Sequence, residues 1–388
     1  MSKLEELIQK LCPDGVEYKL LENCCTILDN KRKPVTRSAR EAGKYPYYGA
    51  NGIQDYVSDY IFDGIFVLVG EDGSVVTENG TPVVTWAVGK IWVNNHAHIA
   101  SEKDGVLLRY LYHYLQTVNV KPLIHGNIPK LTGGDFKALK IPIPPLPVQQ
   151  EIVRILDSFT ELTAELTAEL TARRKQYEYY RDAILTENQD HTTILGEVCD
   201  FVRGPFGGSL KKEIFQKSGY AVYEQQHAIY GDFTFRYFVD EEKYQSMLRF
   251  AVRAGDLIMS CSGTMGKIAI IPEDAPQGII NQALLKLTAK EGVNNKYLKY
   301  CFENSITAQM NVAARGGAIK NVASVSELKD IPINLPPLEE QARIVSILDR
   351  FDSLCNSLTS GLPAEIEARQ KQYEYYRNKL LSFKEKTV

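Results

Sequence analysis

The side chains best suited to chemistry in this chain are cations and amides that could recognise DNA. Five cations occupy ten residues with no acid among them: Lys31, Arg32, Lys33, Arg37 and Arg40. Arginine suits phosphates and guanine edges because its guanidinium is a planar fork, and lysine suits phosphate as a point charge. Tyr48 and Asn51 follow this run. The pattern predicts a DNA-contacting surface, with a solvated surface loop as the alternative.

A second basic stretch lies in the other half of the chain and contains several glycines. Arg203, Lys211 and Lys212 flank the segment Gly204-Pro205-Phe206-Gly207-Gly208-Ser209. Gln225, Gln226 and His227 follow, and glutamine can read an adenine edge in the major groove, as asparagine can. Ser262 and Lys267 lie in or beside a further glycine turn. These residues predict a second DNA-contacting surface.

Patterns typical of catalysis, metal binding or cofactor binding are weak. The turn Gly263-Thr264-Met265-Gly266-Lys267 resembles a phosphate loop but is too short, and Ile268 stands where Ser or Thr should bind magnesium. It could still hold a DNA phosphate, or be an ordinary turn. His96 and His98 could ligate a metal, but a structural role is favoured without a nearby carboxylate or cysteine set. The sequence therefore predicts no catalytic residue, no metal site and no cofactor bound by this chain.

Size and composition place the chain among soluble globular proteins. Its 388 residues suggest two or three domains, and it is 44% hydrophobic and 24% charged. No apolar run approaches the ~18 residues of a membrane span. The seven cysteines form no Cys-x-x-Cys pair, which fits a reducing cytoplasm. The net charge of -3 alone counts against a nucleic-acid binder, but the excess acid lies mostly in residues 141–190.

The chain repeats one plan twice. Lys175-Gln176-Tyr177-Glu178-Tyr179-Tyr180-Arg181 recurs unchanged over residues 371–377. Upstream, residues 152–157 resemble residues 344–349, Pro144-Pro145-Leu146 recurs at 336–338, and Gln149 matches Gln341. Weaker matches align Leu20, Glu22 and Cys24 with Leu195, Glu197 and Cys199, and Asn95 with Asn281. The order is globular region, helical segment, globular region, helical segment.

The repeated segments have the apolar spacing of long helices. Residues 148–186 predict one helix, and a second begins near residue 339, breaks at Gly361-Leu362-Pro363 and continues to about residue 383. Units such as Thr163-Ala164-Glu165-Leu166 repeat every four residues within the first helix. The apolar stripe includes Ile152, Leu156, Tyr177, Tyr180, Ile344, Leu348, Tyr373 and Tyr376. Two such helices are expected to pair as a coiled coil; packing on separate cores is the alternative.

The expected fold is therefore α+β with a pseudo-twofold repeat. Short apolar runs such as 65–69, 83–88 and 257–259 predict buried strands, and 106–117 and 295–309 predict helices. We expect a first globular region over 1–143, a first helical spacer over 144–188, a second globular region over 189–335 and a second helical spacer over 336–388.

The repeated proline-rich start, Ile-Leu-Asp segment and Lys-Gln-Tyr-Glu-Tyr-Tyr-Arg end resemble one known family over the whole chain. That family is the specificity subunit of type I restriction-modification systems (HsdS). The resemblance implies that each globular region is a target-recognition domain reading one half of a split, asymmetric DNA site. It also implies that the two helices pack antiparallel, set the spacer and, through Gln149, Gln341 and the apolar stripe above, dock methyltransferase subunits.

The resemblance further implies a non-catalytic subunit of a larger complex. Two methyltransferase subunits would modify adenine with S-adenosylmethionine, and two restriction subunits would use ATP and Mg for translocation and cleavage. The complex would lie in a prokaryotic cytoplasm, associated with the nucleoid through double-stranded DNA and not with a membrane. A modification-only complex stays open. So do a methyltransferase-nuclease fragment and a structural scaffold that binds no DNA.

Overall fold

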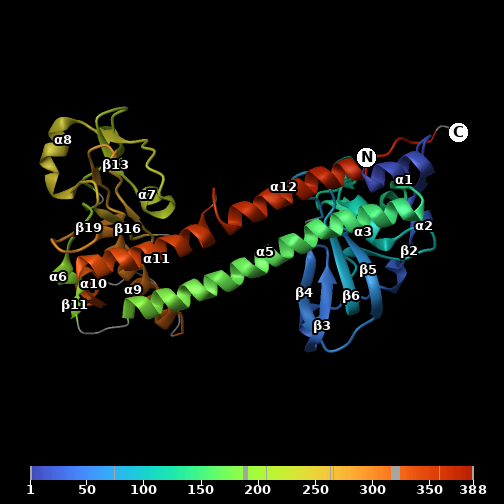
Figure 1. Ribbon diagram of the computed structural model, residues 1–388, viewed down its shortest axis with the longest axis horizontal. Coiled ribbons are helices and arrows are strands. Elements are labelled where there is room, and N and C mark those ends of the chain that lie inside the picture. The colour runs from blue at the N-terminus through green and yellow to red at the C-terminus, as the bar shows by residue number, and fades with distance from the viewer. Residues whose placement is uncertain are drawn as a thin grey trace. The chain divides into compact units, whose positions relative to one another are not determined.

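A computed structural model describes residues 2–73, 75–186, 191–206, 208–262, 264, 266–315, 324–357 and 359–386, with the backbone alone over 306–315. The chain forms two compact units. Unit 1 consists of Met1–Ala168 together with Ala364–Val388, and unit 2 consists of Glu169–Pro363. Unit 1 therefore contains both ends of the chain. Each unit combines one globular region with segments of the helical spacers (Figure 1).

Unit 1 contains a mixed sheet with helices from distant parts of the sequence. Its helices are α1 (Lys3–Leu11), α2 (Leu21–Cys24), α3 (Leu108–Leu115), α4 (Gly133–Lys137), the first part of α5 (Leu146–Thr186) and most of α12 (Leu362–Leu380). Its strands are β1 (Glu17–Leu20), β2 (Thr26–Ile27), β3 (Ala42–Gly49), β4 (Gly52–Val57), β5 (Phe62–Gly70), β6 (Val84–Val93), β7 (Ala97–Ser101), β8 (Ile124–His125), β9 (Lys130–Leu131) and β10 (Lys140–Ile143). Short 3-10 helices cover Asp29–Lys31, Arg37–Ala39 and Lys121–Leu123.

The main sheet of unit 1 has the strand order β2-β7-β5-β6-β3-β4. Its pairs are antiparallel except β3–β6, where Tyr47 lies beside Trp92 in a parallel register. Separately, β1 pairs with β10, so that Glu17 faces Ile143 just before α5 begins. This antiparallel pair brings the two ends of the first globular region together.

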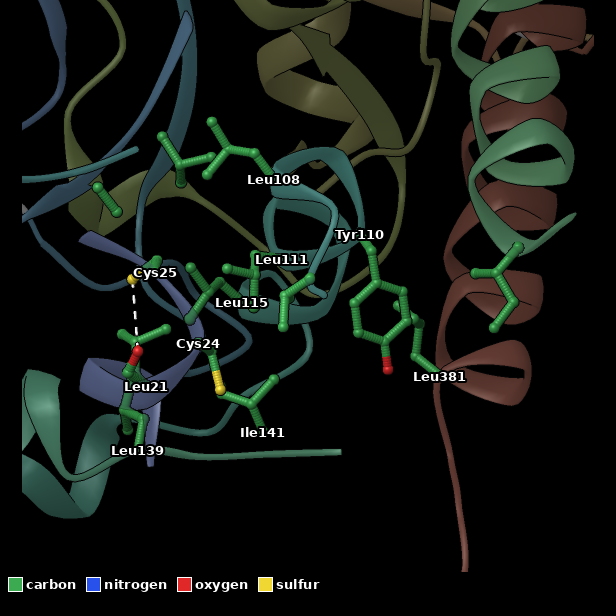
Figure 2. Packing of buried hydrophobic residues seen from close by; sticks show 14 of the residues in the cluster. Leu21, Cys24, Cys25, Leu108, Tyr110, Leu111, Leu115, Leu139, Ile141 and Leu381 are labelled. Atoms are coloured by element: carbon green, nitrogen blue, oxygen red, sulfur yellow. Dashed lines mark hydrogen bonds between the residues drawn. The ribbon is translucent and has the colours of Figure 1, made fainter. Parts of the chain in front are cut away.

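The core of unit 1 joins the sheet to the helices. Val67 and Val69 of β5, Tyr110 and Leu111 of α3, and Leu156 of α5 belong to one cluster of buried side chains. Figure 2 shows Leu21, Cys24, Leu108, Leu115, Ile141 and the C-terminal Leu381 in the same cluster. Burial of such side chains contributes roughly 1.5–3 kcal/mol each. The apolar stripe of α5 is therefore satisfied, over this stretch, within its own unit.

Unit 2 repeats this plan with a divided sheet. Its helices are the end of α5, α6 (Leu195–Val198), α7 (Gln225–Tyr230), α8 (Glu241–Ser246), α9 (Asn295–Arg315), α10 (Val325–Lys329) and α11 (Leu338–Asn356). Its strands are β11 (Thr192–Ile194), β12 (Cys199–Arg203), β13 (Tyr220–Tyr223), β14 (Phe238–Val239), β15 (Ala251–Val252), β16 (Leu257–Ser260), β17 (Ile268–Ile270), β18 (Gly278–Ile280), β19 (Leu284–Ala289) and β20 (Pro332–Asn334). Short 3-10 helices cover Lys212–Ile214 and Leu248–Phe250. The sheets have the orders β12-β19-β16-β17 and β14-β13-β18-β15, and β11 pairs with β20.

The predicted helices and strands are confirmed. Helix α5 has 41 residues. The second helical spacer is interrupted between Asn356 and Leu362, next to the predicted breaker Gly361-Leu362-Pro363. Leu358, which the apolar spacing of the second helical spacer would include, lies outside the described residues. Gly361 has φ +86, a backbone conformation that favours glycine, and a Cβ there would lie 2.5 Å from the carbonyl oxygen of Ser353. The mixed α/β character of two repeated regions is likewise confirmed.

Segments of the two spacers touch within each unit. In unit 1, the Phe159 and Tyr376 rings stack at 5.5 Å. In unit 2, Tyr177 and Tyr180 stack on Phe351 at 6.1 and 6.2 Å, and Arg174 donates to the carbonyl of Cys355 at 3.2 Å. Tyr180 and Tyr376, at the same position of the repeated heptapeptide, therefore make equivalent contacts in the two units.

The structure shifts the weaker sequence matches by one residue. The Leu21 and Leu195 amides donate to Leu139 and Ile331 at 2.8 and 2.9 Å, so Leu21, not Leu20, is the counterpart of Leu195. With Leu21 as the counterpart of Leu195, Cys25 and not Cys24 matches Cys199, because the Cys25 thiol donates to the carbonyl of Leu21 and the Cys199 thiol to that of Leu195. Likewise Asn94, not Asn95, matches Asn281. The short sequence motifs showed that a repeat exists. They could not show which backbone amides make equivalent hydrogen bonds in the two globular regions.

Candidate nucleic-acid interface

The first globular region gathers its polar loops at one end of the main sheet. Because β2 and β5 both run antiparallel to β7, the chain leaving β2 and β5 meets the chain entering β7. The Asn94 amide donates to Tyr48 at 3.0 Å, and the Glu71 amide donates to His96 at 2.8 Å. We call residues 28–40, 49–52, 71–73, 94–96 and 125–130 the first loop surface. It holds every residue of the first predicted DNA-contacting set except Tyr48, which lies directly beneath it.

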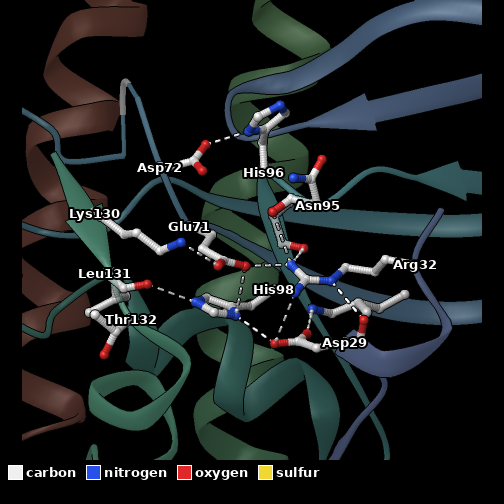
Figure 3. A network of polar contacts seen from close by, with 12 residues as sticks. Asp29, Arg32, Glu71, Asp72, Asn95, His96, His98, Lys130, Leu131 and Thr132 are labelled. Atoms are coloured by element: carbon white, nitrogen blue, oxygen red, sulfur yellow. Dashed lines mark hydrogen bonds and ion pairs between the residues drawn. The ribbon is translucent and has the colours of Figure 1, made fainter. Parts of the chain in front are cut away.

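A charged network lies beneath this first loop surface (Figure 3). Arg32 donates to Glu71 at 2.6 Å and to the carbonyl of Ala97 at 2.7 Å, and Lys130 lies 3.2 Å from the other oxygen of Glu71. His98, which is fully buried, lies with Nδ1 2.6 Å from Asp29 and Nε2 3.0 Å from the carbonyl of Leu131. His98 thus links Asp29 to the backbone of β9 from inside the region.

The charges in this network are already balanced within the protein. Burial acts to raise the pKa of Asp29, but the hydrogen bonds from His98 and from the Ile99 amide, with the Arg32 charge, hold that pKa below its ordinary value. Ligand atoms of Asp29, Glu71 and His98 lie within 4.8 Å of one another, a spacing that could suit a metal. Arg32 and Lys130 occupy the same carboxylates, however, so a cation would have to displace them. We interpret the cluster as a structural ion network.

The structure divides the first predicted set into exposed and interior residues. Lys31, Lys33, Arg37 and Asn51 are exposed on the first loop surface. Arg32 is occupied by the network, with 12% of its side chain exposed, and Tyr48 is buried at 7%. Arg40 stacks on the Tyr47 ring at 4.1 Å and donates to Asp55 at 3.3 Å. Arg32, Arg40 and Tyr48 therefore support the surface from below, and we do not include them among the proposed DNA contacts.

Replacing Arg32 by Ala is expected to destabilise the first globular region, because Glu71 would lose its strongest partner. Removing one member of a fully buried pair costs about 3–5 kcal/mol, and we expect about 2–4 kcal/mol here because Arg32 is slightly exposed. Arg37→Ala, at an exposed position of the same loop, should change stability by less than about 0.5 kcal/mol. Urea unfolding measures both values. Equal stabilities of the two variants would contradict the structural role of Arg32.

The second globular region has an equivalent polar end. Antiparallel pairing brings Arg203 of β12 beside Leu285, and Ser260 of β16 beside Leu284. The Asn281 amide donates to Tyr223 at 2.9 Å, and the Cys261 amide donates to Ala283 at 2.8 Å. We call residues 203–212, 224–226, 261–267 and 281–283 the second loop surface, of which Gly207, Gly263 and Met265 lie outside the described residues.

The two loop surfaces share a backbone frame. Asn94 Oδ1 accepts from the His96 amide at 2.8 Å, and Asn281 Oδ1 accepts from the Ala283 amide at 3.0 Å. Tyr48 and Tyr223 supply the matching carbonyls for the two asparagine amides. The exposed side chains that stand on this frame differ between the regions. Two surfaces that recognise different DNA sequences would need a common backbone frame that carries different side chains.

Most of the second predicted set is exposed, with two qualifications. Arg203, Lys211, Lys212, Ser262 and Lys267 are exposed, and Gln225 and Gln226 are half-buried. The Gln225 amide is engaged by Ser262, whose hydroxyl donates to Gln225 Oε1 at 2.7 Å. His227 is fully buried, with Nδ1 accepting from the Glu224 amide at 2.8 Å and Nε2 3.1 Å from the carbonyl of Thr234. His227 therefore fixes α7 from inside, and we do not include it among the proposed contacts.

The predicted glycine turn at 263–267 is held by a residue that sequence reasoning missed. Ser260 is fully buried, donates to the carbonyl of Thr264 at 2.6 Å and accepts from the Lys267 amide at 3.0 Å. Burial raises the pKa of the neighbouring Cys261 thiol, and the Arg203 guanidinium beside it opposes that rise. The hydrogen bonds of Ser260 therefore hold the backbone between the exposed residues Ser262 and Lys267.

Gln149 and Gln341, predicted on the spacers, clamp each helix to its own globular region. Gln149 accepts from the Leu107 amide at 2.9 Å and donates to the carbonyls of Gly105 and Pro144 at 3.1 and 2.7 Å. Gln341 repeats this with Asn294, Gly292 and Pro336 at 2.8, 3.0 and 2.7 Å. Both glutamines are fully buried. Their matching positions in the repeat predicted that both lie on the spacers, but only the fold shows which backbone groups they bind.

The other predicted spacer residues are also used within the units. Ile152, Leu156, Ile344 and Leu348 are buried in the two cores, and Tyr177, Tyr180 and Tyr376 stack as described above. Tyr373 lies 3.0 Å from Nδ1 of His113. The buried residues thus face their own region, and a partner subunit would meet other side chains of these helices.

A second junction that sequence reasoning missed joins each helix to the globular region. Asp157 lies 2.8 Å from both Arg109 and His113, and Asp349 lies 2.7 Å from both Lys296 and Tyr300. Burial acts to raise the pKa of each carboxyl, but these partners hold both values below the ordinary one. The repeated Ile-Leu-Asp segment was the available signal for this pair of aspartates.

Comparison with known sequences gives a consistent family. A family model described as the type I restriction modification DNA specificity domain matches residues 13–173 and again residues 192–368. A putative type I restriction enzyme specificity subunit from Haemophilus influenzae is 41% identical over 403 residues, covering 98% of each chain. The specificity subunit of EcoR124I and EcoR124II from Escherichia coli is 35% identical over 294 residues, covering 73% of this chain and 72% of that one.

Solved structures resemble the fold over nearly the full length. The type I S subunit from M. genitalium has a TM-score of 0.57 at 15% identity, covering 95% of this chain and 96% of that one. A chain from a study of type I complex assembly has a TM-score of 0.60 at 15% identity, covering 95% and 98%. Within the described residues, no helix is long and apolar enough to cross a membrane. The two matches of the family model and the relative covered at full length show that this chain belongs to the specificity subunits of type I restriction-modification systems.

Proposed function

We propose that this chain reads a two-part DNA site for a type I restriction-modification complex, with one half-site read by each loop surface. The observation that carries this proposal is the shared frame with different exposed side chains. Lys31, Lys33, Arg37 and Asn51 would contact the first half-site. Arg203, Lys211, Lys212, Gln226 and Lys267 would contact the second, with Gln225 and Ser262 acting as one hydrogen-bonded pair. Cations would hold phosphates, and amides would read base edges.

The helical spacers are proposed to pair as an antiparallel coiled coil that sets the unread gap between half-sites. The ring contacts of Phe159 with Tyr376, and of Tyr177 with Phe351, support this pairing because each lies between the two spacers. The Thr-Ala-Glu-Leu units fall in α5, whose length would then act as a ruler. Residues 1–143 and 189–335 would serve as the two target-recognition domains, and 144–188 and 336–388 as the spacers.

Two methyltransferase subunits are proposed to dock on the exposed faces of the spacers. Tyr179 and Tyr375 occupy the same position of the repeated heptapeptide and are 71% and 61% exposed. Each packs edge-on against the next tyrosine, at 5.5 and 5.3 Å, which fixes its ring without burying it. Exposed tyrosines at two equivalent positions fit two copies of one partner, since tyrosine is enriched at protein interfaces.

The reactions themselves are proposed to belong to the partners. S-adenosylmethionine would be bound by the methyltransferase subunits, and ATP and Mg by two restriction subunits, while this chain would bind no cofactor. We place the complex in the prokaryotic cytoplasm, on the nucleoid through its DNA. A modification-only complex would use the same two loop surfaces without the restriction subunits.

Salt-dependent DNA binding tests this function against that of a scaffold. The chain assembled with its methyltransferase subunits should bind duplex DNA with an affinity that falls steeply as salt rises, because phosphate contacts release counterions. Replacing Lys211 and Lys212 together by Ala should lower the slope of log Kd against log salt by about two. Absence of binding at low salt by a fully assembled complex would contradict the proposal.

A further inference from the structure

Phe206, on the second loop surface, is a large apolar side chain that the fold leaves outside. It is 94% exposed, more than any other large apolar side chain of the described residues. Two other apolar residues of this stretch are interior: Pro205 is buried, and Leu210 is 8% exposed within a core cluster. In the isolated subunit the Phe206 ring stays in water, so it contributes no free energy of apolar burial to the fold. The ring of Phe206 is therefore available for contact with a partner.

The loop that carries Phe206 is attached to β19 at its start and has a hydrogen bond within it. The Gly204 amide donates to the carbonyl of Leu284 at 2.9 Å, and the Ser209 amide donates to the carbonyl of Phe206 at 2.9 Å. A Cβ at Gly204 would lie 1.9 Å from the carbonyl oxygen of Asn281, so only glycine allows the loop to lie this close. Pro205 and Leu210 enter the interior on either side. The ring thus projects from a held turn.

The surroundings of Phe206 suit a polyanion. Arg203 precedes it, Lys211 and Lys212 follow it, and all three are exposed. No acid occurs between residues 203 and 212. Ser262 and Lys267 lie on the same loop surface. A flat apolar ring between cations matches DNA, which offers phosphates beside stacked apolar base faces.

We propose that Phe206 inserts between two adjacent base pairs of the second half-site and unstacks that step. The inference rests on the proposed function, which supplies DNA as the ligand of this loop surface. The flanking cations would hold the phosphates on either side of the opened step, which offsets the cost of unstacking. Steps that unstack easily, such as pyrimidine–purine steps, would be favoured at this position, so Phe206 would contribute to specificity without hydrogen bonds to a base.

The test uses the chain assembled with its methyltransferase subunits and duplexes carrying 2-aminopurine at single positions of the second half-site. This base fluoresces more strongly when it is unstacked. We expect the wild-type complex to raise the fluorescence at one step. Phe206→Ala should abolish the rise and weaken binding by roughly 5- to 150-fold. Phe206→Trp keeps a flat apolar ring and should retain both properties.

Two controls separate insertion from other contacts. Lys211→Ala should weaken binding in a salt-dependent manner while leaving the fluorescence rise in place. Probes in the first half-site should respond alike to wild type and Phe206→Ala. A bound wild-type complex that unstacks no step, or a rise that survives Phe206→Ala, would overturn the insertion alone. A wild-type complex that binds no two-part site would overturn the proposed function and the insertion with it.

Discussion

Deletion of Thr163–Leu166 from α5 is expected to move adenine methylation to a site whose unread gap is one or two base pairs shorter, with both half-sites unchanged. Four residues span ~6 Å of helix, against ~3.4 Å of duplex per base pair. Methylation of the original site should fall by about 100-fold or more, because a half-site read out of register mismatches two or more base pairs and each costs about 1–3 kcal/mol. Single-molecule sequencing of the methylated genome measures the new gap directly.

The local sequence lets this deletion shorten α5 without changing the residues around the junction. Thr167-Ala168-Glu169-Leu170 repeats the deleted unit, so Leu162 is followed by the same residues before and after the deletion. The second helical spacer is interrupted between α11 and α12, and the chain at this interruption can adjust to a shorter α5. Glu165→Gln is the control, since it alters an exposed residue and keeps the length. A changed half-site with the old gap would refute the role of α5 as a ruler.

Replacing Gln149 by Ala is expected to destabilise unit 1 by about 3–5 kcal/mol. The change leaves the Leu107 amide and the carbonyls of Gly105 and Pro144 without their buried partner, and each such group costs about 1–3 kcal/mol. The cost falls on the junction between α5 and the first globular region. Recognition of the first half-site should therefore fail before recognition of the second. Urea unfolding, with hydrogen exchange resolved by segment, measures the loss.

The chain offers matched comparisons for this variant. Gln150→Ala removes the neighbouring exposed glutamine and should cost less than about 0.5 kcal/mol. Gln341→Ala removes the equivalent clamp and should affect unit 2 by a similar amount, because its three hydrogen bonds are the same in kind and nearly the same in length. Equal stabilities of Gln149→Ala and Gln150→Ala would mean that the clamp has no energetic role.

The long elements of the fold follow from local sequence. The extent of α5 and the break before α12 could be predicted because apolar spacing, prolines and glycine act within a few residues. The repeat showed that two regions share one plan. Both predictions concern features that neighbouring residues decide.

The roles of single polar residues could not be predicted in the same way. Arg32 stands in a basic run, yet its partner Glu71 lies 39 residues away, and only the fold brings the two together. His227 follows two glutamines suited to base edges but faces the interior. The same limit explains why the sequence matched Leu20 and Asn95, and not Leu21 and Asn94, to residues of the second region. Equivalent positions are defined by backbone hydrogen bonds, which side-chain identity alone does not show. The sequence therefore predicted the two polar loop regions better than it predicted which of their side chains are exposed.

The central claim is that this one chain reads two separate half-sites. Its most direct test is a methylome of cells expressing the chain with its cognate methyltransferase subunit, mapped by single-molecule sequencing. The account predicts one adenine-methylated motif in two parts, separated by a gap of fixed length whose bases are not read. A methylated motif read continuously, or no methylation by a correctly assembled complex, would contradict it.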